Sequence, residues 1–242
     1  MLHLLCGRRH VGKTTLADYL AAKTTRRLRF SPRNSLQAYP GDDYVTSGLS
    51  ASAILQRPSW RSLTVVPDIH VDDAFEHTMR AFKAWYQTME PALLETGESV
   101  SVFVDEARFG GVKDSESFDW VLRCTDRSTV HVILTMHRPK DVLPDIRAIV
   151  DYWYVLYIVH PRDLETLTDE CGDAVATLAP KLKEREFIKY DVNAPPGVRA
   201  WTKRDDAATW APTNHTARRV LPSNLLGDDV SSDVDDFELT DP

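Results

Sequence analysis

The segment GRRHVGKT at residues 7–14 constrains the fold more than any other part of the sequence, because it matches the pattern GxxxxGK[ST]. It follows the apolar run MLHLLC and precedes TTLADYLAA, in which Leu16, Tyr19 and Leu20 recur at helical spacing. A strand, a glycine-containing loop and a helix in this order bring backbone N–H groups and a helix N-terminus to face phosphate groups. The segment therefore predicts an α/β domain that binds a nucleotide; the alternative is a glycine turn that happens to precede a helix.

The side chains of this loop have separate expected roles. We expect Lys13 to reach the β- and γ-phosphate oxygens of ATP, Thr14 to hold Mg²⁺, and Thr15 to offer a second hydroxyl. The expected nucleotide-binding set is Gly7, Arg8, Arg9, His10, Val11, Gly12, Lys13, Thr14 and Thr15.

Two adjacent acids follow the apolar strand Val102-Phe103-Val104. Few structural needs explain Asp105 and Glu106 at the end of a buried strand, although a strand-end cap followed by a solvated acid is the alternative. The run is similar to a Walker B motif, in which Asp105 holds the metal's water shell and Glu106 polarises the water that attacks the γ-phosphate. The second acid favours hydrolysis over transfer to a small acceptor, so the prediction is a Mg-dependent ATPase.

Strands and helices alternate along the chain. Runs at 99–107, 130–137 and 151–159 suit a buried parallel sheet, and we expect one or both of the strands near 26–32 and 62–67 to lie beside it. Residues 71 to about 94 have a helical apolar stripe, and 163–190 also look helical. The prediction is a doubly wound, mostly parallel sheet whose working loops lie at the carboxyl ends of the strands. The domain is expected to span 1–190 with an excursion at 31–60. There Arg33, Asp42, Asp43 and Tyr44 could guide substrate or solvate a loop, and the loop is favoured.

The third strand of this series leads into His137-Arg138-Pro139, which places a polar side chain where a γ-phosphate sensor would lie. The run TVHVILTMHRPKDVLPDIRAIVDYWYVLYIVHPRDLETL resembles the sensor strand and following strand of the FtsK/HerA superfamily, with His137 in place of the usual glutamine. The resemblance covers about 1–23 and 99–168 and implies a RecA/FtsK-HerA-like sheet flanked by helices on both faces. Within that superfamily, the small size resembles genome-packaging ATPases of double-stranded DNA viruses with an internal membrane.

The resemblance also implies partners. It suggests a homo-oligomeric ring, generally a hexamer, that translocates double-stranded DNA into a preformed capsid, with a capsid or membrane protein at a portal vertex as a further partner. The expected location is the virion or the host cytoplasm. An arginine from a neighbouring subunit completes the site in that superfamily, and Arg127, just ahead of the sensor strand, is the first candidate; the rivals are Arg123, Arg138 and Arg147.

Charge along the chain does not single out a DNA-binding surface. The net charge of −7 comes entirely from seven acids after Arg219, so 220–242 is expected to be an acidic tail and 191–219 an irregular extension. This acidic tail could be disordered, act as a docking peptide or mimic a nucleic acid. Two modest basic groups precede it, the second interleaved with acids as on a solvated helix face: Arg26, Arg27, Arg29 and Arg33, then Lys181, Lys183, Arg185 and Lys189.

Two other functions share some of these features. A nucleoside or nucleotide kinase has the same loop and size, and would use 31–60 as a lid, but the paired Asp105 and Glu106 argue against it. A morphogenesis ATPase similar to the zonular occludens toxin-like factors of filamentous phages would usually carry a membrane span, and no such run is present in the sequence. The amino terminus lacks a signal peptide, and three widely spaced cysteines suit a reducing compartment, so secretion is not expected.

Overall fold

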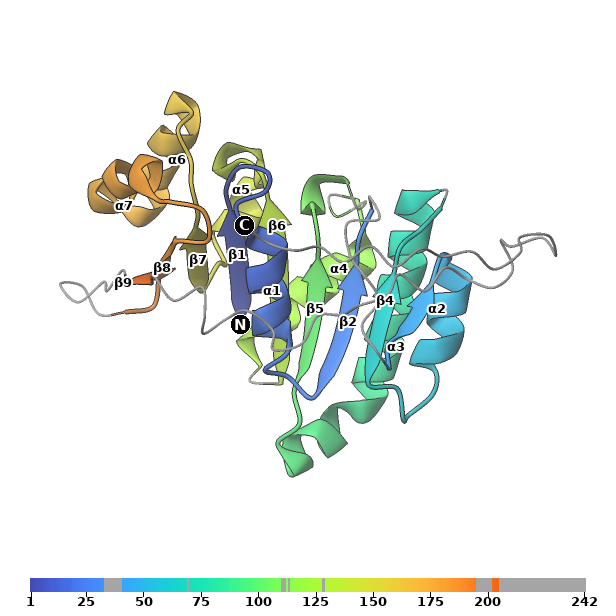
Figure 1. Ribbon diagram of the computed structural model, residues 1–242. Coiled ribbons are helices and arrows are strands. Elements are labelled where there is room, and N and C mark those ends of the chain that lie inside the picture. The colour runs from blue at the N-terminus through green and yellow to red at the C-terminus, as the bar shows by residue number, and fades with distance from the viewer. Residues whose placement is uncertain are drawn as a thin grey trace, which may run out of the picture.

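The sheet at the centre of the molecule is mostly parallel. The structure is a computed structural model that describes residues 1–32, 41–68, 70–109, 112, 114–127, 129–194 and 202–204. In this part of the chain nine strands follow the order β3-β4-β2-β5-β6-β1-β7-β8-β9, and all neighbours from β3 to β7 pair in parallel (Figure 1). β8 and β9 pair antiparallel at the edge. The strands are β1 (Leu2–Cys6), β2 (Arg26–Phe30), β3 (Asp43–Val45), β4 (Ser62–Val65), β5 (Val100–Val104), β6 (Val130–Met136), β7 (Tyr152–Val155), β8 (Phe187–Asp191) and β9 (Thr202–Arg204).

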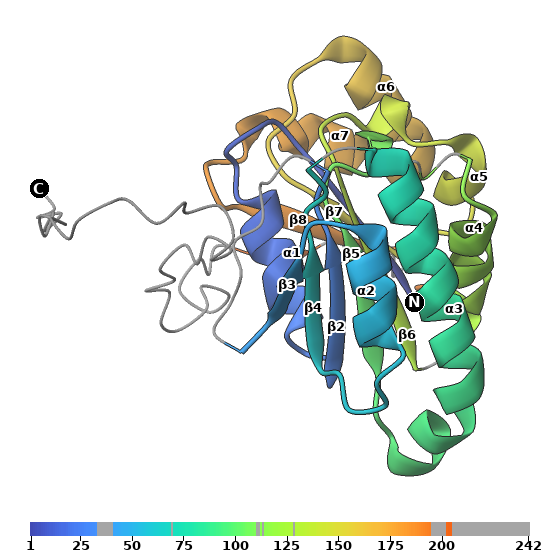
Figure 2. The same ribbon diagram turned by 90° about the vertical axis from the view of Figure 1, so that its right-hand side faces the viewer.

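Helices cover both faces of the sheet, as Figure 2 shows from the side. α1 (Lys13–Ala21) packs on one face, where its Leu16 contacts the cluster that contains Phe103 and Ile133. The other face is covered by α2 (Gly48–Leu55), α3 (Val71–Thr96) and α4 (Glu116–Arg123). The remaining helices are α5 (Pro144–Arg147), α6 (Pro161–Cys171) and α7 (Asp173–Leu178), with 3-10 turns η1 (Ala107–Phe109), η2 (Cys124–Asp126), η3 (Pro139–Asp141) and η4 (Ala179–Lys181). The predicted fold class is therefore confirmed.

The apolar stripe of α3 forms much of the larger core. Phe75, Met79, Phe82 and Tyr86 are buried, as their spacing predicts, while Met89 is partly buried against the same cluster. Burial of each such side chain contributes about 1.5–3 kcal/mol, so this one stripe accounts for a large share of the packing energy. Within the described residues, no helix combines the length and the apolar character that crossing a bilayer requires.

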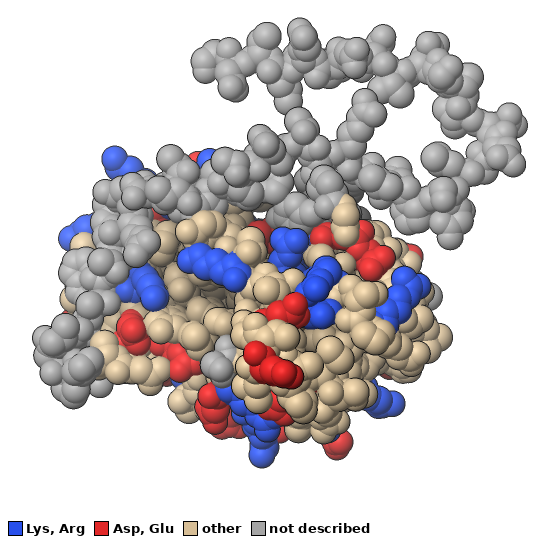
Figure 3. Space-filling view, turned by 90° about the horizontal axis from the view of Figure 1, so that it is seen from below, with Lys and Arg blue, Asp and Glu red and all other residues tan. Residues whose placement is uncertain are grey.

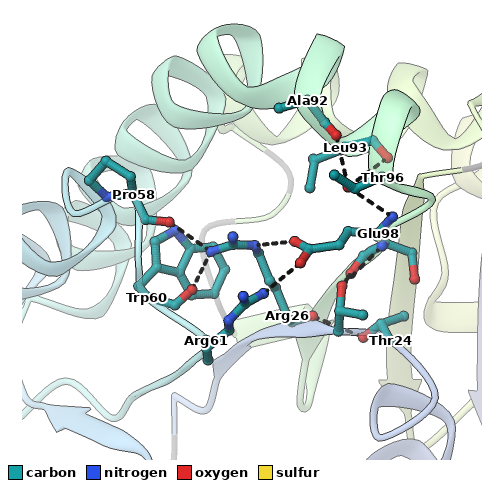
Figure 4. A network of polar contacts seen from close by, with 11 residues as sticks. Thr24, Arg26, Pro58, Trp60, Arg61, Ala92, Leu93, Thr96 and Glu98 are labelled. Carbon is teal, nitrogen blue, oxygen red and sulfur yellow. Dashed lines mark hydrogen bonds and ion pairs between the residues drawn. The ribbon is translucent and has the colours of Figure 1, made fainter.

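An ion-pair network around the buried Arg26 joins the start of β2 to the end of α3 (Figure 4). The Arg26 side chain donates to Glu98 Oε2 at 3.2 Å, to the Pro58 carbonyl at 2.9 Å and to the Trp60 carbonyl. Arg61 donates to Glu98 Oε1 at 3.0 Å. Hydrogen bonds from Arg61 and then Arg26 lower the pKa of the Glu98 carboxyl despite its partial burial. The network fixes the amino-terminal edge of the sheet, opposite the phosphate-binding loop.

Three expectations about secondary structure were wrong. Residues 183–190 are not helical, because a turn leads into β8, whose Ile188 pairs with Val155 of β7. The segment 41–60 is not a solvated loop throughout, since it contains β3 and α2, and α2 packs on α3. The strands expected beside the sheet, β2 and β4, are members of it. The acidic tail lies outside the described residues.

Candidate active site

The loop between β1 and α1 is held between the ends of two neighbouring strands. The Gly7 N–H donates to the Met136 carbonyl at 3.3 Å, and the Arg8 N–H donates to the Tyr157 carbonyl at 3.1 Å. A Cβ added to Gly7 would lie 2.8 Å from Leu156 Cβ, which is closer than real Cβ atoms approach. Glycine is therefore required at this position by the close packing of the loop against the chain that leaves β7.

The turn into α1 presents backbone donors. His10 (φ 62°) and Gly12 (φ 96°) are left-handed, and the Leu16 N–H donates to the Gly12 carbonyl at 3.0 Å as the helix begins. The first turn of α1 has no acidic residue and no side-chain cap. Because the first N–H groups of a helix have no intrahelical acceptor, this end is suited to an anion such as a phosphate.

Lys13 lies in the concavity of the loop. Its ammonium donates to the Gly7 carbonyl at 2.8 Å and to the Arg8 carbonyl at 2.6 Å, and the residue is buried. Burial lowers the pKa of Lys13 to about 8, against the opposing effect of the Asp105 carboxylate. The ammonium is thus charged at neutral pH and lies where a phosphate group would enter the loop.

Asp105, Glu106 and Thr135 form one hydrogen-bonded unit at the ends of β5 and β6. The fully buried Thr135 hydroxyl donates to Asp105 Oδ1 at 2.5 Å and accepts the Glu106 N–H at 2.9 Å. Glu106 has φ 46°, a left-handed conformation that is uncommon outside glycine. The Thr135 hydroxyl therefore links the Asp105 side chain to the backbone of Glu106.

His137 contacts the second acid directly. Its Nε2 donates to Glu106 Oε1 at 2.8 Å, which places the imidazole beside the carboxylate at the end of β6. His137 Nδ1 is buried and has no hydrogen-bond partner within the described part of the chain. The direct contact of these two polar side chains orients the Glu106 carboxylate.

Lys13, the two acids and His137 open on one cleft of about 660 Å³. It is lined by Arg9, His10, Gly12, Lys13, Thr14, Thr15, Asp105, Glu106, His137, Glu184 and Arg185. Within the described residues, no three His, Cys, Asp or Glu side chains gather as metal ligands. Mg²⁺ is commonly held by one or two protein oxygens together with substrate phosphates, and the Thr14 hydroxyl and Asp105 carboxylate supply hard oxygen donors of that kind. The donor set thus fits Mg²⁺ bound with a nucleotide.

A second cleft of about 680 Å³ shares one wall with the first. Arg138 lines it, and its Nε donates to Asp163 Oδ2 at 2.9 Å, where the carboxylate is almost fully buried. This ion pair ties the residue after His137 to the first turn of α6. The cleft is lined by Arg8, Arg9, His10, His137, Arg138, Ile158, Val159, His160 and Asp163.

Similar solved structures place this arrangement in a known fold. The genome packaging NTPase B204 from Sulfolobus turreted icosahedral virus 2, in complex with ATP-gammaS, matches 84% of this chain and 95% of its own, with TM-score 0.64 and 21% identity. The same protein with AMPPCP gives TM-score 0.63 and 21% identity over the same shares. B204, the DNA-packaging ATPase from Sulfolobus turreted icosahedral virus, gives TM-score 0.60 and 20% identity over 84% and 95%.

The chain has the B204 fold. No family model and no curated protein matches the sequence. The likeness at this level of identity concerns the fold, and it agrees with the architecture that the resemblance to the FtsK/HerA superfamily implied.

In this B204 fold, the candidate arginines lie in different places. Arg127 follows η2 at the amino-terminal edge of the sheet and forms a close ion pair with Glu90 of α3. It is therefore remote from the cleft of its own chain. The rivals are also paired: Arg123 with Asp119 at 2.8 Å, Arg138 with Asp163, and Arg147 with Glu170 at 2.8 Å.

The two basic groups of the sequence do not form surfaces of their own. Arg26 and Arg29 are buried, and Arg29 pairs with Asp18 at 3.2 Å and closely with Asp42, while Arg33 lies outside the described residues. Lys181, Lys183, Arg185 and Lys189 are spread over η4, a turn and β8 rather than one helix. On the face in Figure 3, basic and acidic side chains are interspersed.

Sequence reasoning missed one residue buried beneath the acids and two residues that line the cleft. Thr135 joins both acids, but a threonine inside a buried strand is ordinary for its β propensity and gave no signal. Glu184 and Arg185 line the cleft from the turn before β8, whereas they were expected on a solvated helix. β8 was not predicted from the sequence, and its antiparallel pairing with β7 brings this turn to the cleft.

Proposed function

We propose that the protein is a Mg-dependent ATPase that works as a homo-oligomeric ring, a hexamer by resemblance, and translocates double-stranded DNA during the packaging of a viral genome. The observation that supports hydrolysis best is the contact of Glu106 with His137 beside the phosphate-binding loop, in the same cleft as Asp105. The packaging role is supported by the fold shared with B204.

The chemistry follows from the positions of the side chains. Lys13 and the α1 N-terminus stabilise negative charge on the phosphates. Mg²⁺, bound with the nucleotide at Thr14 and Asp105, would withdraw charge from the phosphoryl oxygens. Glu106 accepts a proton from the attacking water, and His137 holds the carboxylate in place through its 2.8 Å hydrogen bond.

The first test is steady-state phosphate release with and without duplex DNA. We expect DNA-stimulated release by the wild type and loss of release in Glu106→Gln, with ATP binding retained, because the amide cannot accept the proton. Glu95→Gln removes the same charge from an exposed position on α3 and serves as the matched control. DNA-indifferent turnover by a protein that stays monomeric at high concentration would count against the proposal. Phosphate appearing on a nucleoside acceptor would indicate a kinase instead.

A neighbour's arginine can be tested by mixing subunits. Arg127 is about half exposed and remote from its own cleft, so we propose that it completes the site of the next subunit. Rings made only of Lys13→Ala chains, or only of Arg127→Ala chains, are expected to release no phosphate. A mixture of the two variants should recover part of the activity, since some subunit interfaces then combine an intact Lys13 with an intact Arg127. Arg80→Ala, which removes an exposed helix pair with Glu76, is the control. No recovery in a mixture that still forms rings would exclude Arg127.

A further inference from the structure

The nucleotide cleft has a second wall on the side away from the acids. The strand order β5-β6-β1-β7-β8 places Asp105 and Glu106 on one side of the phosphate-binding loop. Because β8 runs antiparallel to β7, its first residues lie at the same edge of the sheet as the loop, on the other side of β1. The turn that precedes β8 therefore faces the acids across the loop.

This turn is fixed by contacts on both sides. The Arg185 N–H donates to the Val11 carbonyl of the loop at 3.3 Å. Within the turn, the Lys183 N–H donates to Glu186 Oε2 at 2.9 Å and the Glu186 N–H donates to the Lys183 carbonyl at 3.1 Å. Phe187 is then buried in the small core that also holds Leu16 of α1. The backbone of the turn is thus part of the loop's support.

The side chains at the tip of the turn have no such structural duty. Glu184 and Arg185 are exposed and line the cleft, and neither forms an ion pair within the described ranges. If the reacting phosphate lies between Lys13 and Glu106, the rest of a nucleotide leaves the loop on the far side, toward these two side chains. A guanidinium can stack on an aromatic ring, and a carboxylate accepts hydrogen bonds from hydroxyl groups.

We propose that Glu184 and Arg185 form a nucleoside subsite, in which Arg185 recognises the base and Glu184 the ribose hydroxyls of a ribonucleoside triphosphate. The inference rests on the proposed function, because it assumes that the cleft takes a nucleotide. The competing explanation is that the turn only buttresses the phosphate-binding loop through its backbone. The two explanations differ in whether the side chains affect binding of the nucleoside part alone.

The conformation of Arg185 allows a clean variant. Its φ of 64° favours glycine, so Arg185→Gly removes the side chain while the backbone conformation and the Val11 contact are preserved. Lys183→Ala, in the same turn but outside the cleft lining, is the matched control, since only its backbone N–H and carbonyl contribute to the turn. Glu184→Gln tests the carboxylate separately.

The experiment is calorimetric titration of the full chain with Mg-ATP and with Mg-tripolyphosphate, which has the phosphates but no nucleoside. We expect Arg185→Gly to weaken ATP binding about tenfold, as loss of a cation–π contact does, and to leave tripolyphosphate binding unchanged. Glu184→Gln should narrow the difference in affinity between ATP and 2′,3′-dideoxy-ATP, and Lys183→Ala should bind like the wild type.

The outcomes separate this inference from the proposed function. Equal weakening for ATP and tripolyphosphate, or unchanged ATP binding in Arg185→Gly, would overturn the subsite. If the wild type binds ATP with the predicted dependence on Arg185 but never hydrolyses it, the subsite stands and the ATPase proposal fails. If the wild type binds neither compound, both fail together.

Discussion

Replacing Thr135 by valine should impair Glu106, the proposed catalytic base, without removing its carboxylate. Valine keeps the shape of the side chain but has no hydroxyl, so Asp105 Oδ1 loses its 2.5 Å donor and the Glu106 N–H loses its 2.9 Å acceptor. The second loss matters for chemistry because Glu106 is left-handed at φ 46°, a conformation that costs about 1–3 kcal/mol and persists only where neighbouring groups impose it.

The size of the effect follows from these two bonds. A hydrogen bond to a charged group contributes about 1.5–3 kcal/mol, and leaving a buried N–H without its acceptor costs about 1–3 kcal/mol. We therefore expect Thr135→Val to lower the free energy of unfolding by about 3 kcal/mol, which for a domain of this size corresponds to a fall in Tm of roughly 6–12 °C. Release of Glu106 from its imposed conformation, at about 1.4 kcal/mol, corresponds to roughly a tenfold loss of kcat.

Thr135→Ser separates the hydroxyl from the methyl group. Serine retains both hydrogen bonds and loses only packing, so kcat should stay near that of the wild type even if Tm falls slightly. The assays are urea denaturation followed by circular dichroism and phosphate release at saturating ATP. The reasoning is refuted if Thr135→Val keeps the stability and kcat of the wild type, or if Thr135→Ser loses as much kcat as Thr135→Val.

Three further predictions concern other contacts. Gly7→Ala should cost about 1–3 kcal/mol of stability and weaken ATP binding. Adding Leu156→Ala should not restore stability, because the 2.8 Å approach is to Leu156 Cβ, which alanine retains. Urea denaturation of the single and double variants checks both statements, and an unchanged midpoint in Gly7→Ala contradicts them. ATP affinity should weaken about tenfold between pH 7 and 9, because burial lowers the pKa of Lys13 to about 8 and the uncharged amine no longer attracts phosphate. Calorimetry at fixed ionic strength measures this affinity across the pH range. An affinity that does not change with pH would show that Lys13 stays charged. The ionised Glu98 carboxylate stabilises the fold above its ordinary pKa, and this stability is lost as pH falls through its lowered pKa. The Tm of Glu98→Gln should therefore decline less steeply below about pH 5 than the Tm of the wild type. Parallel declines of the two Tm values would contradict this assignment.

The parts of the fold that were predictable carry their information locally. The loop at 7–14 lies between β1 and α1 because a motif of this kind needs a strand before it and a helix after it. The runs at β5 and β6 are continuous and apolar because both faces of a central parallel strand are covered, and that burial makes the acids at the end of β5 conspicuous. His137 follows β6 for the same reason.

The parts that were not predictable depend on distant partners. Residues 183–186 are rich in helix-forming Lys, Glu and Arg, yet pairing of β8 with β7 overrides that preference. A Cβ on Gly48 would lie 2.7 Å from His77 Cβ, so this glycine permits close packing of α2 on α3. Nothing local in the sequence indicates either contact, nor the left-handed conformation of Glu106.

The position of β1 in the sheet has a consequence for how the molecule is made. Leu2–Cys6 pairs with β6 at Val132–Met136 and with β7 at Tyr152–Val155, so the strand that carries the phosphate-binding loop has both its partners more than a hundred residues later in the chain. During synthesis the loop therefore cannot be held in shape until β7 has left the ribosome, and the cleft is closed by residues made later still. Closing such long loops costs chain entropy before the strand contacts that stabilise them can form. Folding is therefore slow, and apolar strands stay exposed until the sheet is complete. ATP added to a refolding reaction should accordingly stabilise the finished domain without accelerating its slow phase.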